Sequence, residues 1–174
     1  MADVAAEAEF AVGTLYKFFD DKQALYRTII REIASDMNAR LTEALAQAGT
    51  EVEQIGRYID IKMSLFVKHA PLGRLYFSQT TGATWSPEAK LDAELKEMFR
   101  QMLNTLGRIF RRGMRKKLFI DRDPLMLALS LEGLTHGFIS SLAENPQAFR
   151  AEELAAVVKS VFFNGVLRSD LGRA

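Results

Sequence analysis

Hydrophobic residues recur at helical spacing along most of the chain, and no stretch alternates with period two over enough residues to form a sheet. Two short amphipathic segments lie within residues 4–19, separated by a tight turn. Longer helices are predicted, in chain order, over about residues 22–47, 50–68, 86–117, 123–143 and 152–168, with a shorter helix at 72–78. The pattern therefore predicts an all-α fold.

Helix-start signals precede four of the long segments. Two have the spacing of a capping box, and two combine a capping side chain with proline at the first helical position. These signals are Asp20 with Gln23, Thr50 with Glu53, Ser86 with Pro87, and Asp123 with Pro124. Gly49 and Pro71 are predicted to end helices, and residues 118–120 are predicted to form a short extended connector.

The most specific pattern lies in the first 25 residues. Apolar residues share one helical face before the turn and resume the period after it, namely Val4, Ala5 and Ala8, then Val12, Leu15, Phe18 and Phe19. Helices this short are not stable alone, so we expect these residues to pack inward. Such a pair leaves the outer side of its second helix free, and a DNA-binding helix-turn-helix places that side in the major groove.

This stretch resembles the signature of the TetR family of one-component transcriptional regulators, roughly I-A-x-x-A-G-V-S-x-G-T-L-Y-x-Y-F-x-x-K-x-x-L. The matching residues are Val4, Ala5, Ala8, Phe10, Gly13, Thr14, Leu15, Tyr16, Phe19, Lys22 and Leu25. Beyond them only the helical layout and residues 162–167 are similar. The resemblance implies a partial helix-turn-helix domain over residues 1–24 and a TetR-type helical bundle for ligand binding and dimerisation over residues 25–174.

The resemblance also implies which residues contact double-stranded DNA. The implied phosphate contacts are Tyr16 and Lys22, and the implied base-edge contacts are Ala11, Val12, Thr14 and Lys17. Lysine can bind guanine acceptors or phosphate, and small apolar groups can meet a thymine methyl. The alternative is that Thr14, Tyr16 and Lys17 are ordinary surface residues of an amphipathic helix.

Three departures from the family pattern weaken the motif. Glu9 stands where the family usually has glycine, and a left-handed residue with a β-carbon costs roughly 1–2 kcal/mol. Ala11 replaces the usual Ser or Thr cap, a loss of about 1 kcal/mol. The resemblance also implies a further helix upstream of Met1, which the sequence as given does not contain. An alternative is therefore a truncated dimerisation and ligand-binding module that does not bind DNA.

Composition narrows the class of protein. The chain has 174 residues, of which 48% are hydrophobic and 26% charged, as in ordinary globular proteins. It has no cysteine, which excludes disulfides, thiolate metal sites and a cysteine nucleophile. No apolar run approaches the roughly 18 residues of a membrane span, and no signal-peptide pattern begins the chain. We expect a soluble, cytoplasmic protein without a membrane partner.

Charge is distributed unevenly along the chain. Residues 1–22 hold two lysines and five carboxylates, which is a poor electrostatic match for DNA. Residues 107–122 hold seven basic side chains and one acid. We interpret this basic cluster as a solvated helix end whose cations complement the helix dipole, in preference to a nucleic-acid or membrane contact, because no aromatic platform accompanies it.

The last two predicted helices are apolar nearly all round, which indicates burial on several sides. A symmetric homodimer that pairs them in a four-helix bundle would provide that burial. The predicted interface residues are Gly133, Gly137, Phe138, Val158, Phe162 and Val166. Gly133 and Gly137, four residues apart, would allow close backbone approach; alternatively, they serve local fit within one chain.

An effector site is predicted from a set of aromatic, methionine and ionisable residues. Its predicted members are Met63, Phe66, His69, Tyr76, Trp85, Phe99, Leu103, Glu132 and His136. Such a set could line a cavity for a small, largely apolar ligand, with Glu132 and His136 meeting a polar group; each residue alone is more simply explained as core. For Glu132 and His136 the favoured alternative is a polar edge of the dimer seam, with the two bonded together. No metal site, cofactor or catalytic constellation is predicted.

Overall fold

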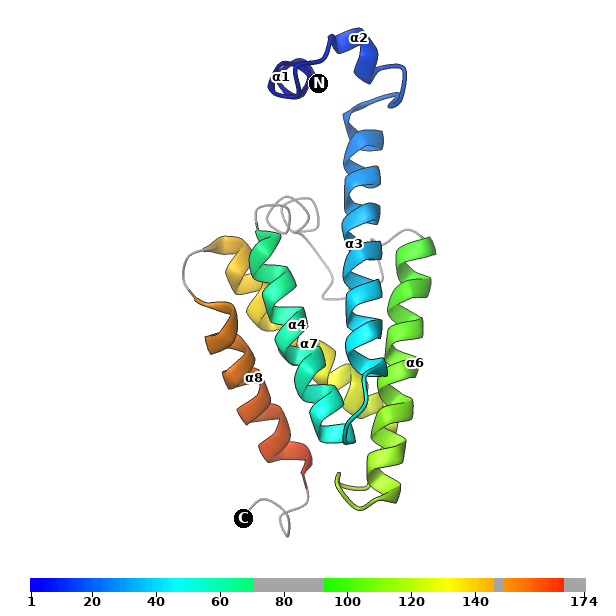
Figure 1. The fold of residues 1–174 in the computed structure, drawn as a ribbon, viewed down its shortest axis with the longest axis vertical. Coiled ribbons are helices and arrows are strands. Elements are labelled where there is room, and N and C mark those ends of the chain that lie inside the picture. The colour runs from blue at the N-terminus through cyan, green and yellow to red at the C-terminus, as the bar shows by residue number, and fades with distance from the viewer. Residues whose placement is uncertain (71–92, 146–148, 168–174) are drawn as a thin grey trace. The chain divides into compact units, whose positions relative to one another are not determined.

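The computed structural model describes residues 1–70, 93–145 and 149–167. These residues confirm the all-α prediction, because they form helices and no strand (Figure 1). The helices are α1 (Ala2–Glu7), α2 (Val12–Leu15), α3 (Lys22–Ala46), α4 (Glu51–Lys68), α6 (Ala93–Arg115), α7 (Pro124–Glu144) and α8 (Ala151–Val166). The predicted helix at 72–78 and the predicted Ser86–Pro87 helix start lie outside the described residues.

The chain divides into two compact units, residues 1–36 and 37–174. Helix α3 begins in the first unit and ends in the second. The predicted functional division into residues 1–24 and 25–174 rests on the motif and stays a prediction.

In the first unit, α1 and α2 are joined by the expected tight turn. Glu9 has a φ of 57°, so the left-handed position is occupied by a residue with a β-carbon. The Phe10 amide donates to the Ala5 carbonyl at 2.8 Å, which closes the turn. Ala11 is the N-cap of α2 and makes no side-chain capping bond. Both expected weaknesses of the motif are therefore present.

The inward packing predicted for the second helix is only partly correct. Leu15 is buried, but Val12 is 40% exposed and Phe18 is 74% exposed. The prediction was wrong for Val12 because α2 is a single turn of four residues, and for Phe18 because it lies three residues beyond the end of α2. One turn can present only one position to its partner helix, and Leu15 occupies it.

Local capping signals set the ends of α3 and α4. Asp21, not the predicted Asp20, caps α3, since its Oδ1 accepts a hydrogen bond from the Ala24 amide at 2.6 Å. The predicted capping box of α4 is confirmed: the Thr50 amide donates to Glu53 Oε2 at 2.7 Å, and the Glu53 amide donates to Thr50 Oγ1 at 3.2 Å. Between the two helices, Gly49 has a φ of 143°.

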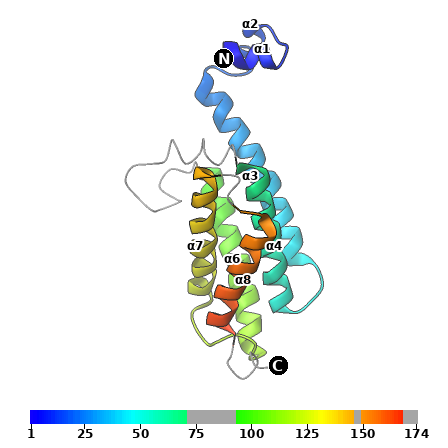
Figure 2. The same cartoon turned by 90° about the vertical axis from the view of Figure 1, so that its left-hand side faces the viewer.

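In the second unit, α4, α6, α7 and α8 pack together around one apolar core (Figure 2). Phe110 lies near its centre, with ring centroids 5.4 Å from Phe119 and 5.8 Å from Phe162. The extended connector predicted for residues 118–120 is present in part. Phe119 forms an isolated antiparallel bridge with Leu167 and the Ile120 amide donates to the Val166 carbonyl at 2.8 Å, whereas the Leu118 amide still bonds back to the Gly113 carbonyl of α6. Asp123 caps α7 as predicted, accepting from the Leu125 amide at 2.7 Å.

Candidate functional site

The side chains predicted to contact DNA lie at the surface of the first unit. Tyr16 is 52% exposed and follows α2 directly. Four of the remaining residues are exposed and Thr14 is half-buried; the exposed four are Ala11, Val12, Lys17 and Lys22. A phenol hydroxyl and two ammonium groups at such a surface can donate hydrogen bonds to phosphate oxygens.

A buried polar cluster joins α4 to α7 in the second unit. Lys62 Nζ lies 2.6 Å from Glu132 Oε2, and the two side chains are only 7% and 12% exposed. The Tyr58 hydroxyl donates to Glu132 Oε1 at 2.6 Å. Glu132 thus has two close hydrogen-bond partners on α4, whereas the sequence suggested His136, on the same helix as Glu132, as its partner. We refer to Tyr58, Lys62, Glu132 and His136 as the α4–α7 polar cluster.

Tyr58 and Lys62 were not among the site residues predicted from the sequence. Both lie on the buried face of α4, four residues apart and interleaved with Ile55, Ile59 and Met63, which are fully buried. A lysine on the apolar face of a predicted helix could have indicated this site from the sequence, because a buried ammonium must be paired. Its partner is 70 residues away, and no local spacing rule identifies it.

Burial controls the protonation of two members of the cluster. It raises the pKa of Tyr58 well above its ordinary value, and the neighbouring Glu132 charge adds to the effect, so Tyr58 stays a neutral donor. Burial lowers the pKa of His136, and the Lys62 charge lowers it further, although Glu132 opposes the shift. His136 is therefore neutral at neutral pH, and the Lys62–Glu132 pair carries no net charge.

Lys62 retains hydrogen-bonding capacity. Its ammonium has three donors, and among the described residues it reaches Glu132 at 2.6 Å and Tyr58 Oη at the long distance of 3.5 Å. An acceptor atom brought to Lys62 would therefore gain a charge-assisted bond. A neutral acceptor suits the cluster best, because a second carboxylate would leave a net charge in the core.

The other residues predicted to bind a ligand are distributed as follows. Met63 and Leu103 are buried in the core, and Phe66 and Phe99 are half-buried against it. His69 is half-buried at the end of α4, and its Nε2 has no hydrogen-bond partner among the described residues. Tyr76 and Trp85 lie outside the described residues.

The predicted dimer interface needs correction on α8. Val158, Phe162 and Val166 are at most 6% exposed and belong to the core of the single chain. Among the described side chains of α7 and α8, the large apolar ones that are exposed are Leu125, Met126, Leu129, Val157 and Val161. Because α8 is apolar on both its inner and outer faces, the sequence could not show which face is inside.

The three predicted interface residues on α7 are more accessible. Gly137 is exposed, and a β-carbon there would meet nothing within 4 Å. Gly133 is half-buried, and Phe138 is half-buried with its side chain against the core. The part of α7 around Gly137 therefore has room for the close approach of another helix.

The described ranges contain neither a candidate metal site nor a candidate membrane-spanning helix. Residues 1–70, 93–145 and 149–167 hold no group of three or more His, Cys, Asp or Glu side chains that could bind a metal ion. None of the helices in these ranges is both long and apolar enough to cross a membrane.

No protein-family model matches the chain, and no curated protein matches its sequence. Solved structures do match. A TetR/AcrR-family transcriptional regulator from Thermobifida fusca superposes with a TM-score of 0.75 at 19% identity, covering 94% of this chain and 84% of its own. The TetR-family regulator PfmR from Thermus thermophilus gives a TM-score of 0.76 at 21% identity, covering 95% and 88%.

A third similar structure is the ketosteroid transcriptional regulator KstR2 of Mycobacterium tuberculosis. Its TM-score is 0.68 at 14% identity, over 96% of this chain and 84% of its own. These likenesses extend over both compact units.

Proposed function

We propose that this chain, which has the fold of the TetR-family transcriptional regulators, is itself a DNA-binding transcriptional regulator. The observation that carries the proposal is the TetR-type signature within residues 4–25, whose Tyr16 and Lys17 side chains are exposed. In a homodimer, the two helix-turn-helix domains would contact successive major grooves of one operator. The similar structures are regulators, and we propose no enzymatic activity.

The experiment is selection of binding sequences from random duplex DNA with the purified chain, followed by fluorescence anisotropy. Tyr16→Ala and Lys17→Ala should weaken binding to the selected sequence at least tenfold without changing the melting temperature. Lys96→Ala is the matched control, because it removes an exposed lysine from α6 in the other unit. Equal affinity of Lys17→Ala and Lys96→Ala would exclude the assigned contacts.

We further propose that the second unit binds a small, largely apolar effector and that the regulator is a repressor released by it. The α4–α7 polar cluster is the proposed anchor: Lys62 would donate to a neutral acceptor such as a carbonyl oxygen. The similarity to a ketosteroid regulator supports this ligand class. The coupling requires only a different affinity of the effector for two arrangements of the protein.

Specific features of residues 1–22 favour a second candidate function. The strained Glu9, the absence of a capping side chain at Ala11 and the five carboxylates among residues 1–22 all disfavour DNA binding. The alternative is a dimeric ligand-binding module that has lost its operator. Selection that enriches no sequence, together with a stable dimer, would establish this alternative.

A further inference from the structure

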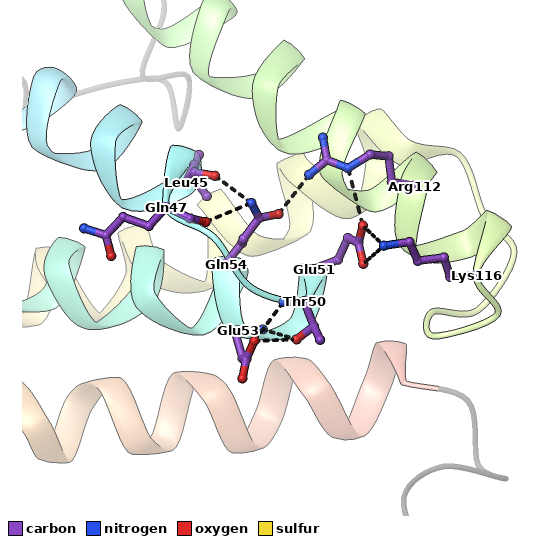
Figure 3. A network of polar contacts seen from close by, with 8 residues as sticks. All are labelled: Leu45, Gln47, Thr50, Glu51, Glu53, Gln54, Arg112 and Lys116. Carbon is purple, nitrogen blue, oxygen red and sulfur yellow. Dashed lines mark hydrogen bonds and ion pairs between the residues drawn. The ribbon is translucent and has the colours of Figure 1, made fainter.

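We propose that Gln54 is a positioning residue that makes the C-terminal end of α3 dependent on the placement of α6. The proposal goes beyond the regulatory function and does not require it, since it concerns contacts within the second unit. Gln54 lies in the first turn of α4 and is 8% exposed. Figure 3 shows its side-chain amide between the end of α3 and the side chain of Arg112 on α6.

The two ends of the Gln54 amide bind different helices. Its Nε2 donates to the Leu45 carbonyl at 2.9 Å and to the Gln47 carbonyl at 3.3 Å. Its Oε1 accepts from Arg112 Nη2 at 2.8 Å. The last carbonyls of a helix have no partner within that helix, so these donors satisfy groups that α3 cannot satisfy itself. Rotation of the amide away from either partner would leave a buried polar atom unsatisfied.

Arg112 is in turn fixed by a buried carboxylate. Glu51, whose side chain is 4% exposed, accepts from Lys116 Nζ at 2.8 Å and from Arg112 Nε at 3.4 Å (Figure 3). Glu51 lies at the start of α4, where the helix dipole favours a negative charge. The Arg112 guanidinium therefore has little freedom to compensate for a movement of α6. A shift of α6 must either move the Gln54 amide or break the hydrogen bond between Arg112 and Gln54.

Arg57 provides a contrast within the same helix. Its guanidinium donates to the Gln47 carbonyl at 2.9 Å and to the Ala48 carbonyl at 3.0 Å. Arg57 thus holds the end of α3 from α4 alone. Gln54 shares the Gln47 carbonyl with Arg57, but its amide also connects this end of α3 to α6 through Arg112. Since α3 begins in the unit of residues 1–36, the fixed end belongs to the helix that is shared by both units.

The test is native-state hydrogen exchange on the full chain. The reporter is the Gln47 amide, which donates to the Glu43 carbonyl at 3.1 Å in the last turn of α3. Among the described residues, the Arg112 side chain makes its hydrogen bonds to Glu51 and Gln54 of α4 and not to α3, yet Arg112→Met should accelerate exchange at Gln47 about fivefold by loosening Gln54. Arg111→Met, at the exposed neighbouring position, should leave this rate unchanged.

Non-additivity distinguishes transmission through Gln54 from general destabilisation. In a Gln54→Met background, Arg112→Met should produce no further acceleration at Gln47. The Val158 amide in α8 reports global opening and normalises each variant. An unchanged Gln47 rate in Arg112→Met, or an equal acceleration with and without Gln54, would overturn the proposal.

Gln54→Glu tests the two ends of the amide separately and covers the case in which Gln54→Met does not fold. A carboxylate keeps an acceptor for Arg112 but loses both donors to the α3 carbonyls. Exchange at Gln47 should accelerate, while the Lys116 amide, which donates to the Arg112 carbonyl at 3.1 Å, should keep its wild-type rate. Wild-type exchange at Gln47 in this variant would also overturn the proposal.

Discussion

The ammonium of Lys62 lies 2.6 Å from the carboxylate of Glu132, and this buried ion pair joins α4 to α7. Most ion pairs contribute little to stability because water already solvates both charges. A buried pair differs, since removal of one partner leaves the other charge without solvent or counter-charge. The pair is thus both a structural link and the proposed effector anchor.

We predict that Lys62→Met lowers the free energy of unfolding by about 3–5 kcal/mol, because Glu132 becomes an unpaired buried charge. Urea denaturation measures the change. Lys159→Met is the control: its ion pair with Asp60, at 2.7 Å, is exposed, and its loss should cost less than about 1 kcal/mol. Replacing Lys62 and Glu132 together by Met and Leu should recover most of the loss. Equal effects of Lys62→Met and Lys159→Met would contradict the assignment.

A tight contact at the end of α6 gives the second prediction. A β-carbon on Gly113 would overlap the ring of Phe119, which is itself fully buried. Gly113→Ala should therefore lower the free energy of unfolding by about 1–3 kcal/mol through overpacking. Gly165→Ala is the matched control, because a β-carbon there meets nothing within 4 Å. That change should stabilise α8 by up to about 1 kcal/mol. Thermal melts of both variants test the contrast.

The third prediction concerns acid stability. Burial alone would raise the pKa of Glu51, but hydrogen bonds from Lys116, from its own backbone amide and from Arg112, together with the charge of Lys116, bring the pKa below its ordinary value. The Glu51 carboxylate therefore binds a proton more readily in the unfolded chain than in the folded one. The resulting stabilisation is fully present above the unfolded pKa of about 4.3 and is lost as the pH falls through the folded pKa. Glu51→Gln should flatten the dependence of unfolding free energy on pH in the acid range below the ordinary pKa of glutamate. A curve parallel to that of the wild type would reject this role.

Features set by neighbouring residues were predictable from the sequence. The capping box of Thr50 and Glu53 and the Asp123 cap depend only on residues within one turn, and the structure shows both. The cap of α3 was misplaced by one residue because Asp20 and Asp21 offer the same chemistry. The left-handed Glu9 followed from its place in the motif.

Features set by distant pairing were not predictable. Tyr58 and Lys62 bind a carboxylate on another helix, and nothing in the sequence around α4 identifies Glu132. The face of α8 was misassigned for a related reason. Val157 and Val158 are equally hydrophobic, yet Val158 is fully buried and Val157 is 46% exposed. Periodicity identifies a buried face only where a polar face opposes it.

The corrected face of α8 determines the last prediction, which concerns the homodimer. Val161 is 56% exposed, and Val157 and Leu129 are also exposed to more than 40%. An exposed apolar set of this kind on two helices is typical of a protein–protein interface, and a second copy of the chain is the proposed partner. A glutamate at Phe162 would not test this proposal, since Phe162 belongs to the core of one chain and its replacement would unfold the chain.

Val161→Glu should convert the dimer to a monomer, because two glutamates related by a twofold axis would be buried without counter-charges. Sedimentation equilibrium gives the mass, and circular dichroism should show unchanged helicity because Val161 is exposed within one chain. Ala156→Glu is the control: Ala156 is an exposed residue of α8 that lies about 140° around the helix from Val161. It should leave the dimer intact. A Val161→Glu variant that sediments with the mass of two chains would place the interface elsewhere, since the proposed contact cannot accommodate two facing carboxylates.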